Sequence, residues 1–199
     1  VDVKEYSFDA LYDRIGYVTQ KAVLFAGDIR ENVLFGESRG DGSEEAVGRA
    51  IELAQAGEFV EKLEGGIHYP ITQGGTNVSG GQKQRLSIAR ALARNPEILV
   101  FDDSFSALDY QTDAKLRKGL SEKLQGTTCM IVAQRIGTIR NADKIVVLDE
   151  GKAVGIGTHR QLLQSCSVYR EIAQSQLSPE ELRRDCGETD GSVSGKEAG

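Results

Sequence analysis

The segment Asn77-Val78-Ser79-Gly80-Gly81-Gln82 constrains the fold more than any other stretch of this 199-residue chain. Ser79 and Gln82 have the spacing of a capping box, which satisfies the first backbone N–H groups of a helix. The two glycines between them let a ligand approach the backbone closely, because they carry no side chain. Free N–H groups and the helix dipole make such a helix start a natural phosphate site. The capping box alone, however, favours an ordinary N-capped surface helix.

Patterns of apolar residues predict a domain in which strands alternate with helices. The continuous apolar run at 98–101 is typical of a parallel strand that is covered on both faces. The helical stretch that starts at Lys83 ends near Asn95, because Pro96 disfavours helix in the residue before it. Further strands are expected at 14–19, 128–133 and 144–148, a hairpin turn at 149–152, and helices at 28–36, 43–56, 109–124, 158–165 and 168–176. The alternation indicates an α/β sheet, and the strandless segment 21–95 would be a helical insertion into it.

The composition excludes several classes of function. Hydrophobic residues at 39% and charged residues at 27% are ordinary for a globular protein. A net charge of -6 argues against a general nucleic-acid binder, because phosphate neutralisation needs a basic surface. The cysteines and histidines lack the spacing of a metal site or a disulfide framework: Cys129, Cys166, Cys186, His68 and His159. Cys129 lies in an apolar run, which predicts a buried thiol.

Two carboxylates directly follow the apolar run at 98–101. Asp102 stands at the carboxyl end of this strand, where α/β sheets place their ligands. A lone aspartate there would be interpreted as a helix cap, but Asp103 and the segment 104–109 follow at once. In phosphate-binding ATPases an aspartate in this place holds Mg²⁺, usually through water. The pair therefore predicts an Mg²⁺ site at this edge of the sheet.

Together these segments resemble the motifs of ATP-binding cassette (ABC) proteins. The signature motif, which binds ATP in trans, is matched by Ser79, Gly80, Gly81 and Gln82. Walker B is matched by the strand ending in Asp102 and Asp103, and the D-loop by Ser106, Ala107, Leu108 and Asp109. Gln20 is similar to the Q-loop glutamine, which in that family touches Mg²⁺ and senses the membrane domain. The switch histidine is matched in position by Gln134.

The resemblance covers residues 1 to about 176 and implies a particular fold. That fold is a RecA-like P-loop NTPase sheet, incomplete at the N-terminus, with an ABC-specific α-helical subdomain. Residues 1–20 would end in the Q-loop, 21–95 would form the helical subdomain, and 96–176 would carry Walker B, the D-loop and the switch loop. The polar residues 177–199 have little to bury and are expected to form a flexible tail.

Four departures from the family pattern affect the predicted chemistry. A Walker A motif, G-x-x-x-x-G-K-[ST], is absent from the sequence, so the chain is expected to begin after it. Asp103 replaces a glutamate that is longer by roughly 1.5 Å, and a misplacement of about 1 Å can cost a hundredfold in rate. Gln134 replaces the histidine, and an amide cannot carry positive charge. The segment 72–74 lacks the Gly-Glu pair that exporters commonly carry there.

His159 lies in a stretch that resembles the closing segment of these domains, and it is expected to have a structural or capping role.

These residues and departures imply one half of an asymmetric exporter. The segment 27–36 resembles exporters in which the transmembrane domain and the nucleotide-binding domain share one polypeptide. ATP and Mg²⁺ would be the cofactors, with Gln20 and Asp102 on the metal, and hydrophobic compounds or lipids the cargo. The domain would lie on the cytoplasmic face of the plasma (inner) membrane. A second nucleotide-binding domain would pair with it head to tail.

Asp103 and Gln134 both weaken water activation and contact with the γ-phosphate. Together they resemble the degenerate-site subunit of bacterial heterodimeric exporters, whose signature serves the partner's ATP. Two alternatives remain from other classes. One is a soluble ABC ATPase acting on DNA or ribosomes, although no coiled-coil or zinc insertion is visible in the sequence. The other is a non-catalytic interaction fragment, since the chain holds no Walker A.

Overall fold

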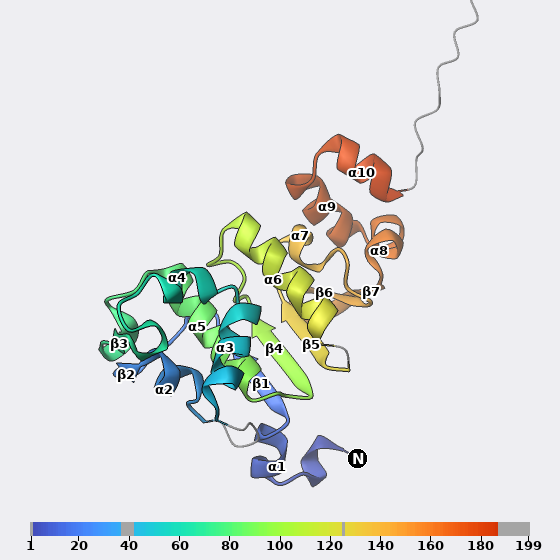
Figure 1. The fold of residues 1–199 in the computed structure, drawn as a ribbon. Coiled ribbons are helices and arrows are strands. Elements are labelled where there is room, and N and C mark those ends of the chain that lie inside the picture. The colour runs from blue at the N-terminus through green and yellow to red at the C-terminus, as the bar shows by residue number, and fades with distance from the viewer. Residues whose placement is uncertain (1, 37–41, 125, 187–199) are drawn as a thin grey trace, which may run out of the picture. The chain divides into compact units, whose positions relative to one another are not determined.

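The computed structural model describes residues 2–36, 42–124 and 126–186 of the chain (Figure 1). The chain divides into two compact units, Val1–Ala133 and Gln134–Gly199. The predicted boundaries after residues 20 and 95 both fall inside the first unit. The reason is that the sheet and the helical segment share one hydrophobic core, in which Val18 and Phe101 belong to the same cluster as Val47.

The first unit is built on a parallel sheet with the strand order β1-β4-β5. Its strands are β1 (Ile15–Val18), β4 (Ile98–Asp102) and β5 (Thr128–Val132), close to the ranges that the apolar runs predict. Val18 pairs with Phe101, and Asp102 pairs with Val132. The parallel register therefore brings the residues that follow all three strands to one edge of the sheet. This edge carries three of the predicted site residues, Gln20, Asp102 and Asp103.

The helices of the first unit fall within or close to the expected ranges, except α1, which the sequence did not predict. They are α1 (Phe8–Tyr12), α2 (Ile29–Val33), α3 (Glu44–Leu53), α4 (Gly57–Glu61), α5 (Gly80–Ala93) and α6 (Tyr110–Lys123). One prediction for this region was wrong, because the segment 21–95 does contain strands. β2 (Gly27–Asp28) pairs antiparallel with β3 (Pro70–Ile71). A pair of two-residue strands is too short to produce the alternating pattern by which strands are recognised.

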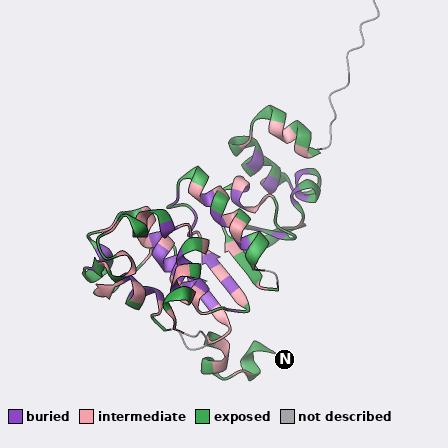
Figure 2. Ribbon diagram, viewed as in Figure 1, coloured by how far each residue is buried: buried purple, intermediate pink, exposed green. Residues whose placement is uncertain are grey.

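Helix α5 lies at the centre of the helical segment and is largely buried (Figure 2). It packs against α2, α3 and β1. Two of its polar side chains connect it to the chain after β1. Gln84 Nε2 donates to the carbonyl oxygen of Thr19 at 3.1 Å, and Arg90 Nε donates to that of Asn32 at 2.7 Å. The Arg90 guanidinium also lies over the ring of Phe25. Gln84, close to the start of α5, thus fixes that end of the helix relative to the segment that carries Gln20, and Arg90 fixes the other end.

Cys129 is exposed, so the prediction of a buried thiol was wrong. It lies on β5, one of the two outer strands of the sheet formed by the described residues. Met130 and Val132 on the same strand are 58% and 51% exposed. An apolar run predicts burial only when its strand is covered by neighbouring structure, and within the described residues β5 is paired on one edge only, with β4.

The second unit contains a hairpin covered by helices. β6 (Ile145–Asp149) pairs antiparallel with β7 (Lys152–Gly157), as the turn at 149–152 predicts. The helices are α7 (Ile136–Ile139), α8 (His159–Ser165), α9 (Ser167–Gln176) and α10 (Pro179–Cys186). Leu162, Tyr169 and Ala173 form much of the core.

Helix α10 corrects the prediction that a flexible tail begins at residue 177. None of its residues is fully buried, although Leu182 packs partly buried against the core of this unit, and polar contacts add to this packing. Asp185 Oδ2 lies 3.0 Å from His159 Nε2, and Asp185 Oδ1 accepts from Arg140 at 3.3 Å. The sequence gives no apolar stripe to indicate such a helix. The rest of the expected tail, 187–199, lies outside the described residues.

His159 has a structural role, as expected. It is buried, and its Nδ1 lies 2.8 Å from the hydroxyl oxygen of Tyr169. Burial raises the pKa of Tyr169 to about 12, so its hydroxyl is protonated at neutral pH. The capping residue of α8 is its neighbour Thr158, whose side chain accepts from the backbone N–H of Gln161.

Replacing Asp185 with alanine should release α10. The change removes the carboxylate that both Arg140 and His159 contact. Arg140 is partly buried and His159 is buried. Such a loss costs about 1–3 kcal/mol. Hydrogen exchange should therefore show faster exchange of the α10 amides. Glu180→Ala is the matched control, because Glu180 is an exposed acid of the same helix. Unchanged protection in the Asp185 variant would contradict the polar docking of α10.

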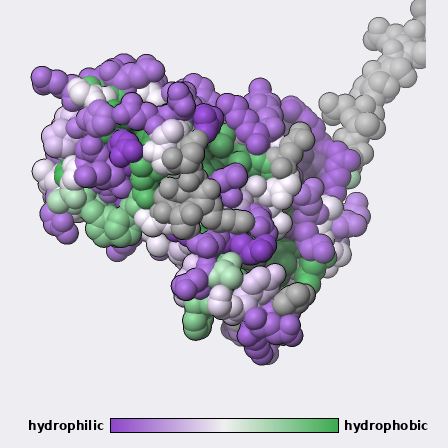
Figure 3. Space-filling view, turned by 60° about the horizontal axis from the view of Figure 1, so that its bottom comes forward, coloured by the Kyte–Doolittle hydropathy of each residue, from purple (hydrophilic) through white to green (hydrophobic). Residues whose placement is uncertain are grey.

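The described part of the chain contains no helix that could cross a membrane. None of the described helices has the length and apolar character that a bilayer span requires. The face in Figure 3 is mostly hydrophilic, and its apolar side chains lie in separate patches.

Candidate functional site

Three predicted site residues meet at the carboxyl edge of the first sheet. Asp102 is the last residue of β4, Asp103 follows it, and Gln20 lies two residues beyond the end of β1. Gln20 Nε2 donates to Asp103 Oδ2 at 3.0 Å, and the Tyr17 hydroxyl donates to Asp102 Oδ2 at 2.8 Å. Each carboxylate is thus hydrogen-bonded to a side chain from the β1 segment. The hydrogen bond to Asp102 raises the pKa of Tyr17, so the phenol is the donor at neutral pH.

The backbone at Asp103 makes a sharp turn. Its φ of 44° lies in the left-handed region, which aspartate tolerates better than most residues. Its N–H donates to the Val132 carbonyl at 2.9 Å, and its own carbonyl accepts from the Ser106 hydroxyl at 2.7 Å. Ser104 between them is fully buried, and its hydroxyl has no partner among the residues that the structure describes. The Asp103 carboxylate is therefore held by a rigid turn.

The donor atoms at this edge fit Mg²⁺. Asp102 Oδ1 accepts no hydrogen bond within the described residues, because Tyr17 contacts only Oδ2. Gln20 donates through its amide nitrogen, which leaves the amide oxygen for a ligand. Hard oxygen ligands suit this ion, which usually takes one or two carboxylates together with water and phosphate oxygens. Among the described residues, no group of three or more His, Cys, Asp or Glu side chains is arranged to hold a metal ion by itself.

The capping box at the start of α5 is present as predicted. The Ser79 hydroxyl accepts from the N–H of Gln82 at 3.3 Å, and Gln82 Oε1 accepts from the N–H of Ser79 at 2.9 Å. Ser79 and Gly80 are exposed. The remaining N–H groups of the first turn therefore face outward at the positive end of the helix dipole.

The two glycines at this helix start are not required by the chain itself. Neither has a positive φ. A Cβ added at Gly80 would meet nothing within 4 Å, and one at Gly81 would lie 3.6 Å from the carbonyl oxygen of Ala107 in ordinary contact. At Gly16, in contrast, an added Cβ would lie only 2.8 Å from a methyl carbon of Leu99. Glycine is also a poor helix former, about 1 kcal/mol worse than alanine in helix interiors. Gly80 and Gly81 thus have no structural explanation within the described residues.

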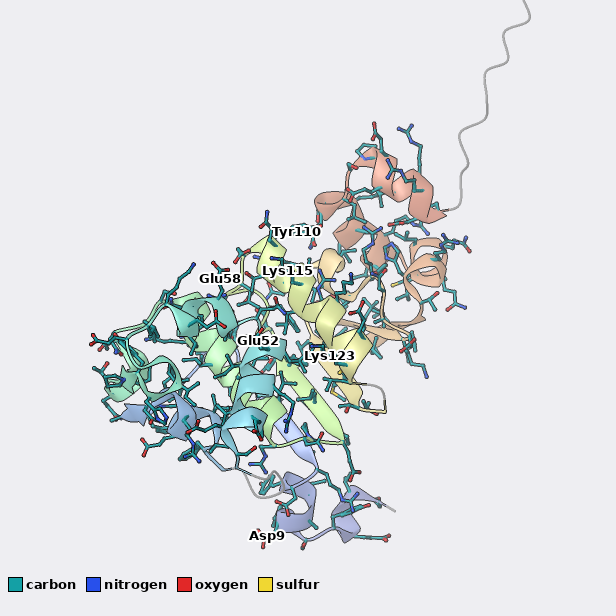
Figure 4. The ribbon with its side chains drawn as sticks, viewed as in Figure 1. Asp9, Glu52, Glu58, Tyr110, Lys115 and Lys123 are labelled. Carbon is teal, nitrogen blue, oxygen red and sulfur yellow. The ribbon has the colours of Figure 1, made fainter. Side chains whose placement is uncertain are left out.

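The predicted D-loop lies beside this helix start. Leu108 is buried, and Asp109 caps α6 by accepting from the N–H of Thr112 at 2.9 Å and from its hydroxyl at 2.6 Å. These hydrogen bonds lower the pKa of Asp109. Tyr110, the first residue of α6, points away from the helix into solvent and is 77% exposed (Figure 4). Ser106 and Ala107 therefore form a short exposed loop between the buried residues Phe105 and Leu108.

Gln134 begins the second compact unit, so its proximity to the two carboxylates stays a prediction. Its carbonyl oxygen accepts from Gln176 Nε2 at 2.8 Å, and Gln176 Oε1 accepts from the N–H of Ile136 at 2.8 Å. The backbone of this loop is thereby held by α9. The sequence had given no reason to single out Gln176, Gln84 or Tyr17, because each acts through a long-range contact.

Comparison with known proteins agrees with this arrangement. The family model described as ABC transporter matches residues 1–106. An uncharacterised ABC transporter ATP-binding protein of Mycobacterium tuberculosis is 44% identical over 177 residues, which are 88% of this chain and 30% of the relative. An ATP-dependent lipid A-core flippase of Alcanivorax borkumensis is 36% identical over 90% of this chain and 31% of its own length. The chain thus spans about 30% of the length of these relatives.

A solved structure supports the same assignment at the level of the fold. A bacterial Atm1-family ABC exporter with ATP bound matches 89% of this chain and 31% of its own, with 33% sequence identity and a TM-score of 0.83. The chain has the mixed α/β fold of an ABC exporter nucleotide-binding domain. The matched family model covers more than half of the chain and includes Gln20, the helix start at Ser79 and both carboxylates. The chain belongs to the ABC transporter family.

Proposed function

We propose that this chain is the C-terminal part of the nucleotide-binding domain of an ATP-driven exporter. In the assembled transporter it couples ATP binding and hydrolysis to the efflux of hydrophobic compounds or lipids. The likeness to a lipid A-core flippase supports a lipid-like cargo. The domain works at the cytoplasmic face of the membrane, joined to a transmembrane domain in the same polypeptide.

The observation that carries this proposal is the pair of glycines at the start of α5. Neither the backbone conformation nor the space around Gly80 and Gly81 requires glycine. A ligand that approaches the backbone from outside does require it, because any side chain would stand in its way. The exposed N–H groups favour an anion there. The γ-phosphate of an ATP held by a second nucleotide-binding domain satisfies both conditions.

The carboxylates at the sheet edge form the other half of an ATP site. Asp102 and Gln20 would hold Mg²⁺ there. A bound Mg²⁺ would supply positive charge that stabilises the phosphates of ATP. Asp103 occupies the position that orients the attacking water, and Gln134 that of the group on the γ-phosphate. A complete ATP site also needs a phosphate-binding P-loop, and these 199 residues contain no such motif.

Two features support a slow or regulatory role for this chain's own site. Asp103 is one methylene shorter than glutamate, and its Oδ2 already accepts a hydrogen bond from Gln20. Gln134 offers an amide donor that cannot carry positive charge. The helix start at Ser79, in contrast, has every backbone feature that an anion site needs. The chain is therefore the degenerate half of a heterodimer and gives its intact signature to the partner's catalytic site.

We expect the full-length subunit and its partner, reconstituted in lipid vesicles, to move a fluorescent lipid or hydrophobic dye when ATP and Mg²⁺ are added. The 199-residue chain alone should neither bind ATP tightly nor hydrolyse it, because no Gly-Lys-Ser/Thr loop cradles the phosphates. Calorimetry on the isolated chain provides the second measurement. Micromolar binding of ATP by the isolated chain, or vesicles in which neither cargo moves, would contradict the proposal.

A further inference from the structure

The side chain of Tyr17 reaches the carboxylate of Asp102 from the neighbouring strand. We infer that Tyr17 is a positioning residue, which fixes the orientation of the Asp102 carboxylate for Mg²⁺; the inference rests on the proposed function. The Tyr17 hydroxyl donates to Asp102 Oδ2 at 2.8 Å. This contact is made to only one of the two carboxylate oxygens.

The register of the sheet explains why a tyrosine at this position reaches the aspartate. Tyr17 pairs with Val100 across the parallel strands, and Asp102 lies two residues beyond Val100 on the same face of β4. Diagonal neighbours of this kind are about 7–8 Å apart, which a long aromatic side chain can span. A phenylalanine would place its ring in the same direction but could not donate. The hydroxyl is therefore the part of Tyr17 that matters to Asp102.

Tyr17 contributes little to the packing of the domain. It is 53% exposed, whereas Gly16 and Val18 on either side of it are buried. Burial alone gives no reason for a large aromatic residue here, and an exposed hydrogen bond adds little to stability. The contact has a clearer consequence for geometry. With Oδ2 bound to the phenol, the carboxylate cannot rotate freely, and Oδ1 stays available to the metal or its water.

The two carboxylates of the site are held by different residues of the β1 segment. Tyr17 holds Asp102, and Gln20 holds Asp103. Partners that orient a ligating carboxylate commonly change metal affinity by 10–100-fold when they are removed. We therefore expect Tyr17→Phe to weaken metal binding at this site by about tenfold.

The test measures metal affinity directly, with Mn²⁺ as a spectroscopic substitute for Mg²⁺. The full-length subunit is assembled with a partner whose own metal-binding aspartate is replaced by asparagine, so that Mn²⁺ bound with ATP reports this chain's site. Electron paramagnetic resonance then gives the Mn²⁺ dissociation constant. Tyr110→Phe is the matched control, because Tyr110 is also an exposed tyrosine of the first unit, and no hydrogen bond of its hydroxyl is found among the described residues.

The inference predicts that Tyr17→Phe raises the Mn²⁺ dissociation constant about tenfold and leaves the melting temperature unchanged. Tyr110→Phe should change neither quantity. Wild-type Mn²⁺ affinity in Tyr17→Phe would overturn it. So would a lower melting temperature with unchanged affinity, which would assign Tyr17 to stability alone. Asp102→Asn separates this failure from that of the proposed function. If that variant still binds Mn²⁺ normally, Asp102 is not the metal ligand and both proposals fail.

Discussion

Gly81→Asp should abolish nearly all ATP turnover by the assembled transporter while leaving the domain folded. The new carboxylate would lie where the first-turn N–H groups of α5 would otherwise face a γ-phosphate. Two unit charges 4 Å apart repel by about 4 kcal/mol in a partly solvated site, which corresponds to roughly a thousandfold in rate. We therefore expect a loss of at least about a hundredfold in turnover.

The fold should tolerate this substitution. A Cβ at position 81 makes only an ordinary contact with the Ala107 carbonyl, and an acidic residue in the first turn of a helix is favourable. The melting temperature without nucleotide should thus stay near that of the wild type. Gly48→Asp, in the middle of α3, is the matched control, because a Cβ there also meets nothing within 4 Å. It adds the same charge away from a helix start and should keep normal turnover.

Gly81→Ala separates the steric part of the effect from the electrostatic part. Alanine should leave the free energy of unfolding unchanged or slightly higher, because it forms helix better than glycine. Turnover should fall, but less than with aspartate. Normal turnover in Gly81→Asp would mean that this helix start serves no hydrolytic site. A marked drop in its melting temperature would instead support the view that the glycines only begin a helix.

Restoring Asp103→Glu together with Gln134→His should raise hydrolysis at this chain's own site. The longer carboxylate reaches the attacking water, and the histidine can share positive charge with the γ-phosphate. A correctly placed general base contributes typically 10²–10⁴-fold. We expect at least about a tenfold rise in turnover, since other parts of the site can remain slow. The left-handed backbone at Asp103 should lower stability a little, because glutamate tolerates that conformation less well.

The measurement needs a partner whose own catalytic glutamate is disabled, so that turnover reports the restored site alone. The single variants provide the controls. Asp103→Glu without Gln134→His should give less than the pair, because both groups act on the same step. No rise in turnover with a partner that has an intact signature segment would contradict the roles assigned to these two residues.

The sequence predicts well those parts of the fold that depend on a few neighbouring residues, such as apolar runs and helix caps. Apolar runs locate β1 and β4, and the parallel-strand rule then brings Gln20, Asp102 and Asp103 to one edge. The capping residue Asp28 and the capping box at Ser79 give the starts of α2 and α5 within a residue. These features depend on a few neighbouring residues, which is why they can be recognised without a structure.

The features that the sequence does not indicate depend on contacts between distant residues. Helix α10 has no fully buried side chain: Leu182 packs partly buried against the core, and Asp185 contacts His159 and Arg140. The hydrogen bond from Tyr17 to Asp102 joins residues 85 positions apart. Cys129 lies in a run as apolar as that of β4 but on an outer strand of the described sheet. Neither composition nor periodicity distinguishes an outer strand from a central one.

The most direct test of the proposed asymmetry is to find which subunit of the assembled transporter carries hydrolysed nucleotide. The transporter is incubated with Mg²⁺, vanadate and a photoreactive ATP analogue, irradiated, and separated into its subunits. We predict that trapped diphosphate labels the P-loop of the partner, whose ATP is completed by Ser79 and Gly81 of this chain, and that this subunit retains triphosphate. Equal diphosphate labelling of both subunits would contradict the account.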